Sequence, residues 1–479
     1  MRYVLFWILS ISTLCAQDQI QPYKDYDNDW LSPQFHKGRR DALAQKMKPH
    51  SIAVLFSSEE RLRSNDTYYQ YKPESNFYYL TGFREPNAAL IYLPEGWVVG
   101  GKTYSTVMFV PKRDYRYEVY NGRRMGTDGT QKILGIDTAF TNDEFSTQLN
   151  KILLQQLAAS KLENVYCFNL REQYDTKTLR NMTTAFTDFR NNPRSLLGYM
   201  NSVDFINVEP LIGELRAVKT DEEIVLLKKS IEITNDAHLQ MMKSCEPGQK
   251  EFEIKAVGEY VFTRLGAEYE GYGSICGSAE NSIILHYTTD RRQMKDGDVL
   301  LVDMASEYHG YSADVTRSYP VNGKFTKEQT IIYNIVLKAQ QAGIDRIKTN
   351  VPYREVADAI TQTLEDGLLE IGLIQDRKEA KKYTVHGYMH SIGLDVHDPQ
   401  SYDKPFVPGF FTTVEPGIYI PENAPCDKKW WNIGIRIEDD ILVTESGNIN
   451  LSERVPRKIE DIEKLMKKKG VGNVPLDNN

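Results

Sequence analysis

The feature of this sequence that most constrains its fold is a pattern of helix signals that occurs twice in the second half. Thr220 and Glu223 form a helix-capping box, in which the Thr side chain can accept a backbone N–H while the Glu side chain reaches back. Thr326 and Gln329 repeat the box further along the chain. A capping box marks the start of a helix, so two helices are predicted to begin here.

The same signals follow both helices at nearly the same spacing. A proline follows the first helix of each pair, at Pro247 and Pro352, and a glycine ends the second helix, at Gly266 and Gly372. The matched spacing predicts an internal duplication, in which two helix–helix–sheet units share one core. Chance agreement between common helix signals is the alternative.

The first half of the chain has a different pattern. Residues 52–56, 88–93 and 106–110 are short runs rich in strand-forming residues, whereas residues 146–159 have helical periodicity. This alternation predicts a compact α/β domain, with a boundary to the duplicated part between residues 201 and 215. The first domain offers no Ser, Cys or His arrangement that is typical of catalysis.

Length and composition agree with two folded domains. A chain of 479 residues is too long for one ordinary core. Its content of 41% apolar and 26% charged residues is typical of globular proteins. A formal net charge of -8 argues against nucleic-acid binding, which requires a concentrated basic surface.

The amino terminus has the pattern of a secretory signal. Met1 and Arg2 are followed by the mostly apolar residues 3–14 and by a small residue, Ala16, at the expected cleavage site. This run is too short to span a bilayer, which takes about 20 residues. We therefore expect residues 1–16 to be removed and the protein to be periplasmic or extracellular. A lipid-modified Cys15 and an ordinary first strand or helix are the alternatives.

Four widely spaced cysteines remain after such cleavage: Cys167, Cys245, Cys276 and Cys426. None of them has the CxxC spacing of a structural zinc site. An oxidising compartment would allow them to pair, but their wide spacing in a large protein favours isolated buried thiols.

Two aspartates in the second half are candidates for metal binding. Asp303 ends an apolar strand, and Asp314 lies on the strand after the next turn. A turn on residues 308–309 would place the carboxylates opposite each other, and a turn on residues 309–310 would place them diagonally on one face. Like charges so close destabilise a fold unless a cation lies between them. An exposed sheet face is the alternative.

Two glutamates and three histidines extend this candidate site. Glu415 and Glu438 each lie in an apolar strand, where an ionised carboxylate is costly unless it is paired. His386, His390 and His397 lie close together in one segment. One imidazole and four carboxylates, divided between the duplicated halves, are the donors that two adjacent divalent ions require. A lone histidine packed in the core is the alternative reading.

This part of the chain resembles the pita-bread metallopeptidases, which include methionine aminopeptidase, prolidase and aminopeptidase P. The resemblance extends over residues 215–455, and the five metal ligands of the family match, in order, Asp303, Asp314, His390, Glu415 and Glu438. In the first half, residues 76–88 (NFYYLTGFREPNA) resemble an N-terminal domain that aminopeptidase P and prolidase share and methionine aminopeptidase lacks.

The resemblance implies an α+β fold with two domains. An α/β N-terminal domain over residues 30–205 would precede a pita-bread catalytic domain with an internal pseudo-twofold repeat over residues 215–460. Residues 461–479 would form a C-terminal tail.

The resemblance also implies a role for each site residue. The five ligands would hold two ions that share a hydroxide, and Glu415 would in addition shuttle a proton. His286 and His397 match histidines that orient the substrate and stabilise the oxyanion. Manganese is the expected metal, and cobalt, iron or zinc also suit an oxygen-rich site with one imidazole. Three residues match the proline side of the cleft, the last of them less clearly: His386, Arg436 and Tyr419.

The implied activity is the metal-dependent release of the first residue from Xaa-Pro peptides, by attack of the shared hydroxide on the scissile carbonyl. We expect peptide substrates, no nucleic acid, no stable membrane span, and a homo-oligomer, either a dimer or a tetramer. Prolidase, which cleaves only Xaa-Pro dipeptides, is the main alternative because it shares both domains. A non-catalytic peptide-binding protein on the same fold is a further alternative, although all five ligands are present in this chain.

Overall fold

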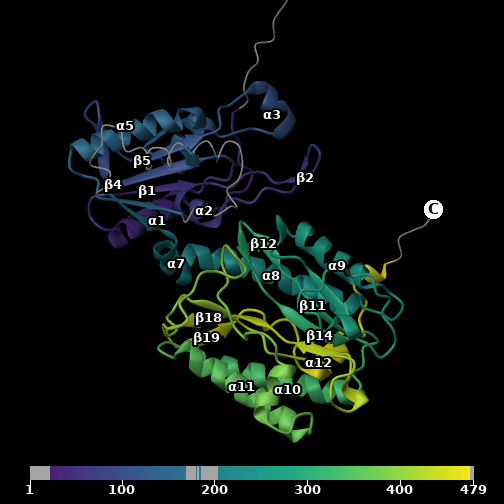
Figure 1. The fold of residues 1–479 in the computed structure, drawn as a ribbon. Helices are drawn as coiled ribbons and strands as arrows, with labels where there is room; N and C mark the ends of the chain where they lie inside the picture. Colours follow the sequence, from purple (N-terminus) through teal and green to yellow (C-terminus); the bar gives the residue numbers. More distant parts are fainter. Residues whose placement is uncertain (1–21, 169–179, 181–182, 185–202, 475–479) are drawn as a thin grey trace, which may run out of the picture. The chain divides into compact units, whose positions relative to one another are not determined.

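The computed structural model describes residues 22–168, 180, 183–184 and 203–474, and the chain divides into two compact units after Val208 (Figure 1). Each unit is described separately below. Among the described helices, none combines the length and the apolar character needed to cross a bilayer.

The first unit is built on a six-stranded mixed sheet with the strand order β6-β5-β4-β1-β7-β8. The central strand β1 is buried along its whole length and pairs antiparallel with β4 and parallel with β7. Phe145 and Leu149 of helix α5 pack into the core of this sheet. The strands and helices are β1 (Ser51–Phe56), β4 (Ala89–Val99), β5 (Lys102–Val110), β6 (Thr138–Thr141), β7 (Asn164–Cys167), β8 (Asp204–Asn207), α1 (Pro33–Lys46), α2 (Ser75–Thr81), α3 (Tyr115–Asn121), α4 (Gly126–Leu134) and α5 (Phe145–Ala158), with a short hairpin of β2 (Leu62–Ser64) and β3 (Thr67–Tyr68). The three predicted strands and the predicted helix of this half are confirmed.

The second unit contains two pairs of long helices with strands between them (Figure 1). The Thr220 hydroxyl accepts the Glu223 N–H at 3.4 Å, and the Thr326 hydroxyl accepts the Gln329 N–H at 3.2 Å, so both predicted capping boxes form. The helices are α7 (Glu209–Ala217), α8 (Asp221–Ser244), α9 (Glu251–Arg264), α10 (Lys327–Arg346), α11 (Tyr353–Glu370) and α12 (Ile459–Leu465).

Each helix pair is followed by a group of strands, in the order that the predicted duplication requires. The first pair packs against β10 and β12, and α10 of the second pair packs against β15, β16 and β17. The strands are β9 (Tyr269–Glu270), β10 (Ile275–Ser278), β11 (Val299–Asp303), β12 (Ser306–Tyr308), β13 (Tyr311–Ser312), β14 (Thr316–Pro320), β15 (Phe411–Val414), β16 (Gly417–Ile420), β17 (Ile433–Arg436), β18 (Asp439–Thr444) and β19 (Gly447–Asn450).

The structure decides between the two turns that the sequence left open. Tyr308 pairs with Tyr311, so the turn residues are His309 and Gly310, which have φ angles of 49° and 85°. Positive φ at both central residues is typical of the type I′ turn, whose twist matches that of the flanking strands. Further along the hairpin Asp303 lies opposite Thr316. Asp314 is therefore placed diagonally from Asp303.

Cys245, Cys276 and Cys426 are free thiols. Cys167, Cys245 and Cys276 are buried, as predicted, and Cys426 is half-buried.

Candidate active site

A cavity of about 790 Å³ in the second unit brings together the residues that the sequence singles out. Its lining includes all five candidate metal ligands and four of the other predicted site residues, namely His286, His386, His397 and Arg436. Tyr419 is absent from the described residues that line it. Unpredicted residues in the lining include Tyr272, Thr288, Gln400 and Tyr402.

The four candidate carboxylates lie at or just beyond strand ends. Asp303 ends β11, Asp314 precedes β14, Glu415 follows β15, and Glu438 lies between β17 and β18. The strand ends of both halves therefore meet at one place. His390 comes from the irregular segment before β15, which runs beside that strand because its N–H and carbonyl both bond Thr413, at 3.1 and 2.8 Å.

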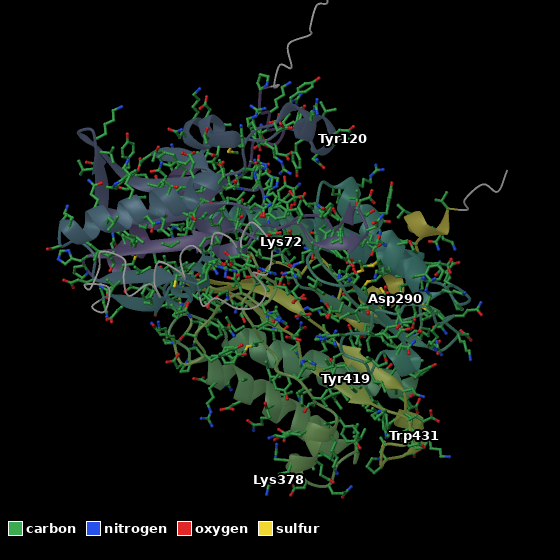
Figure 2. The ribbon with its side chains drawn as sticks, turned by 45° about the horizontal axis from the view of Figure 1, so that its top comes forward. Lys72, Tyr120, Asp290, Lys378, Tyr419 and Trp431 are labelled. Atoms are coloured by element: carbon green, nitrogen blue, oxygen red, sulfur yellow. The ribbon has the colours of Figure 1, made fainter. Side chains whose placement is uncertain are left out.

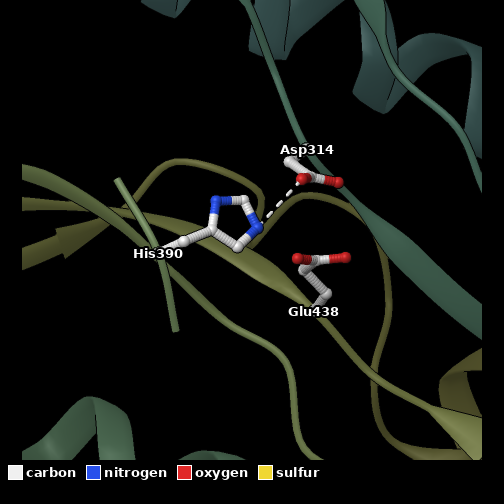
Figure 3. A group of neighbouring side chains, drawn as sticks. All are labelled: Asp314, His390 and Glu438. Atoms are coloured by element: carbon white, nitrogen blue, oxygen red, sulfur yellow. Dashed lines mark ion pairs between the residues drawn. The ribbon is translucent and has the colours of Figure 1, made fainter. Parts of the chain in front are cut away.

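Three of the five candidates form one group. Possible ligand atoms of Asp314, His390 and Glu438 all lie within 4.8 Å of one another (Figure 3). The His390 Nε2 atom lies 3.3 Å from Asp314 Oδ2 and 3.4 Å from Glu415 Oε1. Asp303 is connected to the group through Tyr272, as described next.

Tyr272 is a site residue that the sequence analysis missed. Its hydroxyl lies 2.5 Å from Asp303 Oδ1 and 2.6 Å from Asp314 Oδ1. A hydroxyl has one proton, so it can donate to only one of two ionised carboxylates at a time. No local signal separates Tyr272 from the rest of the 29 tyrosines of the chain.

The electrostatics of this cluster fit bound cations. Burial raises the pKa of Glu415 to about 8, and burial together with the charge of Asp314 raises the pKa of Glu438 well above its usual range. Burial alone would lower the pKa of His390, but the nearby Asp314 and Glu415 carboxylates raise it to about 9. Oxygen donors that repel one another around a single imidazole are the donor set that divalent cations stabilise.

Residues next to the candidate ligands hold them in place. The Thr316 hydroxyl donates to Glu438 Oε2 at 2.6 Å. The guanidinium of Arg317, which is fully buried, donates to the Glu438 carbonyl at 2.5 Å and to Asp439 Oδ1 at 2.6 Å. Ligand orientation by such neighbouring groups is a general feature of metal sites.

A hydrogen-bonded chain links Asp303 to His386. Arg436 contacts Asp303 Oδ2 at 2.5 Å and donates to the Tyr419 hydroxyl at 2.8 Å. The Tyr419 hydroxyl lies 2.7 Å from His386 Nε2, and burial lowers the pKa of His386 to about 4, so the neutral imidazole accepts this bond. Tyr419, which is labelled in Figure 2, lies on β16 and is buried, and its hydroxyl connects two residues that line the cavity.

His286 and His397 line the cavity from two different segments and are both exposed. The His397 ring packs edge-on against His390, with the ring centroids 4.3 Å apart. Burial and the neighbouring His390 lower the pKa of His397. His286 lies in the segment between β10 and β11, next to the buried Tyr287.

Comparison with known proteins places this site in a family. Residues 225–445 match the family model of metallopeptidase family M24, and residues 36–159 match that of the aminopeptidase P N-terminal domain. The Xaa-Pro aminopeptidase of Escherichia coli (strain K12) is 36% identical over 448 residues, which are 91% of this chain and 98% of that protein.

Solved structures give the same result. Aminopeptidase P from E. coli with the inhibitor Pro-Leu superposes with a TM-score of 0.82 at 35% identity, over 91% of this chain and 99% of that one. A zinc-substituted E. coli aminopeptidase P in complex with product gives a TM-score of 0.82 at 36% identity, with the same coverage of both chains.

Proposed function

Because the chain belongs to the aminopeptidase P family of metallopeptidases, we propose that it releases the first residue from peptides whose second residue is proline. One observation supports this most strongly. A single cavity holds the five candidate metal ligands together with His286, His397 and Arg436. This combination brings into one cavity the groups that could activate the attacking water, stabilise the carbonyl oxygen and contact the leaving proline.

We propose that two divalent ions, with manganese as the expected metal, are held by Asp303, Asp314, His390, Glu415 and Glu438. The donor set of four carboxylates and one imidazole supports this assignment. When bound by these residues, divalent ions would supply a water of lowered pKa, about 7, and a Lewis acid for a carbonyl oxygen. Hydrogen bonds from Tyr272 and Thr316 orient the candidate ligands.

The proposed proton carrier is Glu415. Its Oε1 faces His390 Nε2 at 3.4 Å and its Oε2 faces His386 Nδ1 at 3.5 Å, so the carboxylate spans from the ligand group towards the proline side. From this position it can take a proton from the attacking water and return it to the leaving proline nitrogen.

The proposed role of the two exposed histidines is to bind the scissile carbonyl region. A neutral imidazole carries one N–H, and the lowered pKa of His397 favours that form. N–H groups directed at the developing oxyanion stabilise the transition state.

Recognition of proline cannot use the N–H that most peptide bonds donate, because the proline nitrogen has none. We propose that His386 and Arg436 form the wall against the proline ring, with Tyr419 holding both in place. Asp303 and Glu438 are the carboxylates available to a free α-amino group. This arrangement supports exopeptidase action on an unblocked amino terminus.

The activity is tested with purified, metal-loaded protein on three matched substrates: an Xaa-Pro-Yaa tripeptide, the same tripeptide with an acetylated amino terminus, and the Xaa-Pro dipeptide. Cleavage of the tripeptide between Xaa and Pro, and its loss on acetylation, are expected. Hydrolysis of the dipeptide alone would replace this proposal with prolidase activity. No cleavage of any of the three at any metal loading would favour the non-catalytic alternative.

We also propose that the protein is exported and that its mature form begins at or near Gln17. The charged start, the apolar run and Ala16 support this. N-terminal sequencing of the native protein tests it, and Met1 retained in a cytosolic fraction would contradict it. A homo-oligomer, either a dimer or a tetramer, is proposed as well, and analytical ultracentrifugation of the purified protein would detect a monomer instead.

A further inference from the structure

One lysine of the second unit is buried against the segment that carries His390 and His397. The Lys219 side chain is 1% exposed, and its ammonium donates to Ser391 Oγ and to Asp398 Oδ2, both at 3.1 Å. Lysine is almost never fully buried unless it is paired. Both partners of this lysine lie far along the chain, in the active-site segment.

The two partners of Lys219 are also paired with each other. The Asp398 N–H donates to the Ser391 carbonyl at 2.9 Å, which closes the intervening chain into a loop. A histidine precedes each of these two residues, and the rings of the two histidines, His390 and His397, pack edge-on with their centroids 4.3 Å apart. The ammonium therefore spans the point at which the two histidines come together.

The two ends of this loop differ in their other supports. The N–H and the carbonyl of His390 both bond Thr413, at 3.1 and 2.8 Å, so the His390 end is fixed to β15. Among the described residues, none makes a hydrogen bond to the His397 ring, which only packs against that of His390. The position of the His397 ring therefore depends on its backbone, and so on Asp398, the next residue.

The Asp398 carboxylate is held by two cations. Its Oδ1 accepts from Arg216 at 2.5 Å, and its Oδ2 accepts from Lys219 at 3.1 Å. Its Oδ1 also lies 3.2 Å from the Asp395 nitrogen, which closes the short turn that contains His397. Buried ion pairs add little net stability, because desolvation offsets their attraction, but they require a defined geometry of their partners. This favours a role in positioning.

The backbone of Lys219 is fixed as well. Its N–H donates to the Gly409 carbonyl at 2.9 Å, and the next residue, Thr220, is the N-cap of α8. A Cβ at Gly409, which has a φ of 85°, would lie only 2.8 Å from the Lys219 carbonyl oxygen, so the two segments approach closely. The capping box that the sequence predicts thus anchors the lysine that precedes it.

We propose that Lys219 is a positioning residue for His397. Its ammonium joins Ser391 to Asp398 and thereby sets where the His397 ring lies beside the candidate ligand His390. This inference rests on the proposed Xaa-Pro aminopeptidase function, in which His397 stabilises the oxyanion, and adds the group that holds this histidine in place. Lys219 is absent from the described residues that line the cavity, so it acts through Asp398 and not on the substrate.

Lys219→Met tests this role, because it removes the ammonium and keeps most of the apolar stem. The oxyanion develops only in the transition state, so kcat should fall about 10- to 100-fold while KM stays nearly unchanged. In the His397→Ala background the same substitution should cost nothing further, since Lys219 acts through that histidine. Steady-state kinetics of the wild type, both single variants and the double variant on an Xaa-Pro-Yaa peptide measure this coupling.

Ser391→Ala covers the case in which Lys219→Met does not fold. It removes only the hydroxyl that accepts from Lys219 and leaves Asp398 paired with both cations. We expect kcat to fall about 3-fold, again with no loss in the His397→Ala background.

Hydrogen–deuterium exchange examines the loop without any substrate. The Asp398 N–H, which bonds the Ser391 carbonyl, should exchange about 10-fold faster in Lys219→Met than in the wild type. The amides of α10 should exchange at the wild-type rate in both proteins, which separates a local change from misfolding.

Lys324→Met is the matched control. Lys324 lies just before the second capping box, and its exposed ammonium bonds Glu463 at 2.7 Å, away from the cavity. This variant should keep the wild-type kcat and the wild-type exchange rate at Asp398.

Equal losses of kcat in the wild-type and His397→Ala backgrounds, or an unchanged kcat in folded Lys219→Met, would overturn the inference. Failure of the wild-type protein to cleave Xaa-Pro-Yaa would instead refute the proposed function. In that case hydrogen exchange decides the inference separately. An unchanged exchange rate at Asp398 in Lys219→Met would refute it.

Discussion

At the scale of single residues, the site gathers more negative charge than the chain neutralises. Glu415 and Glu438 have raised pKa values, and the nearby positive groups are His390 and Arg436. The Tyr272 hydroxyl lies between the Asp303 and Asp314 carboxylates and can donate its one proton to either of them. The placement of the candidate ligands therefore depends on neighbours that are not candidate ligands themselves.

Tyr272→Phe tests that dependence, because it removes the hydroxyl and keeps the ring. Loss of a group that orients metal ligands typically weakens metal affinity by about 10- to 100-fold, and we expect a loss in this range. Metal titration of the apoprotein, followed by calorimetry, measures it. Tyr269→Phe, on the exposed strand β9, is the matched control. Unchanged affinity in Tyr272→Phe would show that its hydroxyl does not orient Asp303 and Asp314.

At the scale of elements, the first residue of α9 organises the segment that carries His286. Glu251 is fully buried, and its Oε1 accepts from the Ser278 N–H, the Ser278 hydroxyl and the Asn281 amide at 2.8, 2.7 and 3.0 Å. Its Oε2 accepts from the Tyr287 hydroxyl at 2.9 Å and the Arg292 N–H at 3.1 Å. The start of helix α9 therefore holds in place the segment that carries the exposed His286.

Tyr287→Phe removes one of these bonds next to His286 and keeps the ring. We expect kcat/KM to fall about 10-fold, because small displacements of a catalytic group are costly. The double variant with His286→Ala should be no slower than His286→Ala alone, since Tyr287 acts through that histidine. Steady-state kinetics of the four proteins, with Tyr260→Phe on the exposed face of α9 as control, measure this coupling. Additive losses would mean that Tyr287 only stabilises the fold.

At the scale of the whole molecule, each unit has elements and a core of its own, and the candidate ligands belong to the second unit only. Ions that bind the folded state and not the unfolded chain stabilise the unit that holds them. Metal removal is therefore expected to act on one unit and to leave the other unchanged.

Calorimetric unfolding with and without a chelator tests this expectation. The transition of the second unit should move to lower temperature, and that of the first unit should stay in place. The effect should grow with pH. The pKa of Glu415 is raised from 4.5 to about 8 and that of His390 from 6.5 to about 9, so the metal-free fold loses stability as pH rises through this range. Equal shifts of both transitions, or none, would contradict the assignment of the ions to the second unit.

The sequence by itself was sufficient to predict many of the elements and to propose the five candidate ligands, which line one cavity in the structure. Capping boxes such as that of Thr220 and Glu223 are local signals, and they mark helix starts wherever they occur. Glu415 and Glu438 could be singled out because a carboxylate within an apolar run is costly without a partner, although the structure places both just beyond strand ends. The short apolar runs of the first half were sufficient to predict its three strands, because the spacing of apolar residues along a chain indicates which side chains are buried.

Tertiary structure decided the rest, because those features depend on contacts between distant segments. The choice of His309 and Gly310 as turn residues, and thus the diagonal placement of Asp303 and Asp314, was set by pairing along the whole hairpin. Tyr272 carries no local signal, and only the folded cavity shows that its hydroxyl lies between Asp303 and Asp314. Sequence supplies the chemical groups of a site, whereas the distances between them exist only once the chain has packed.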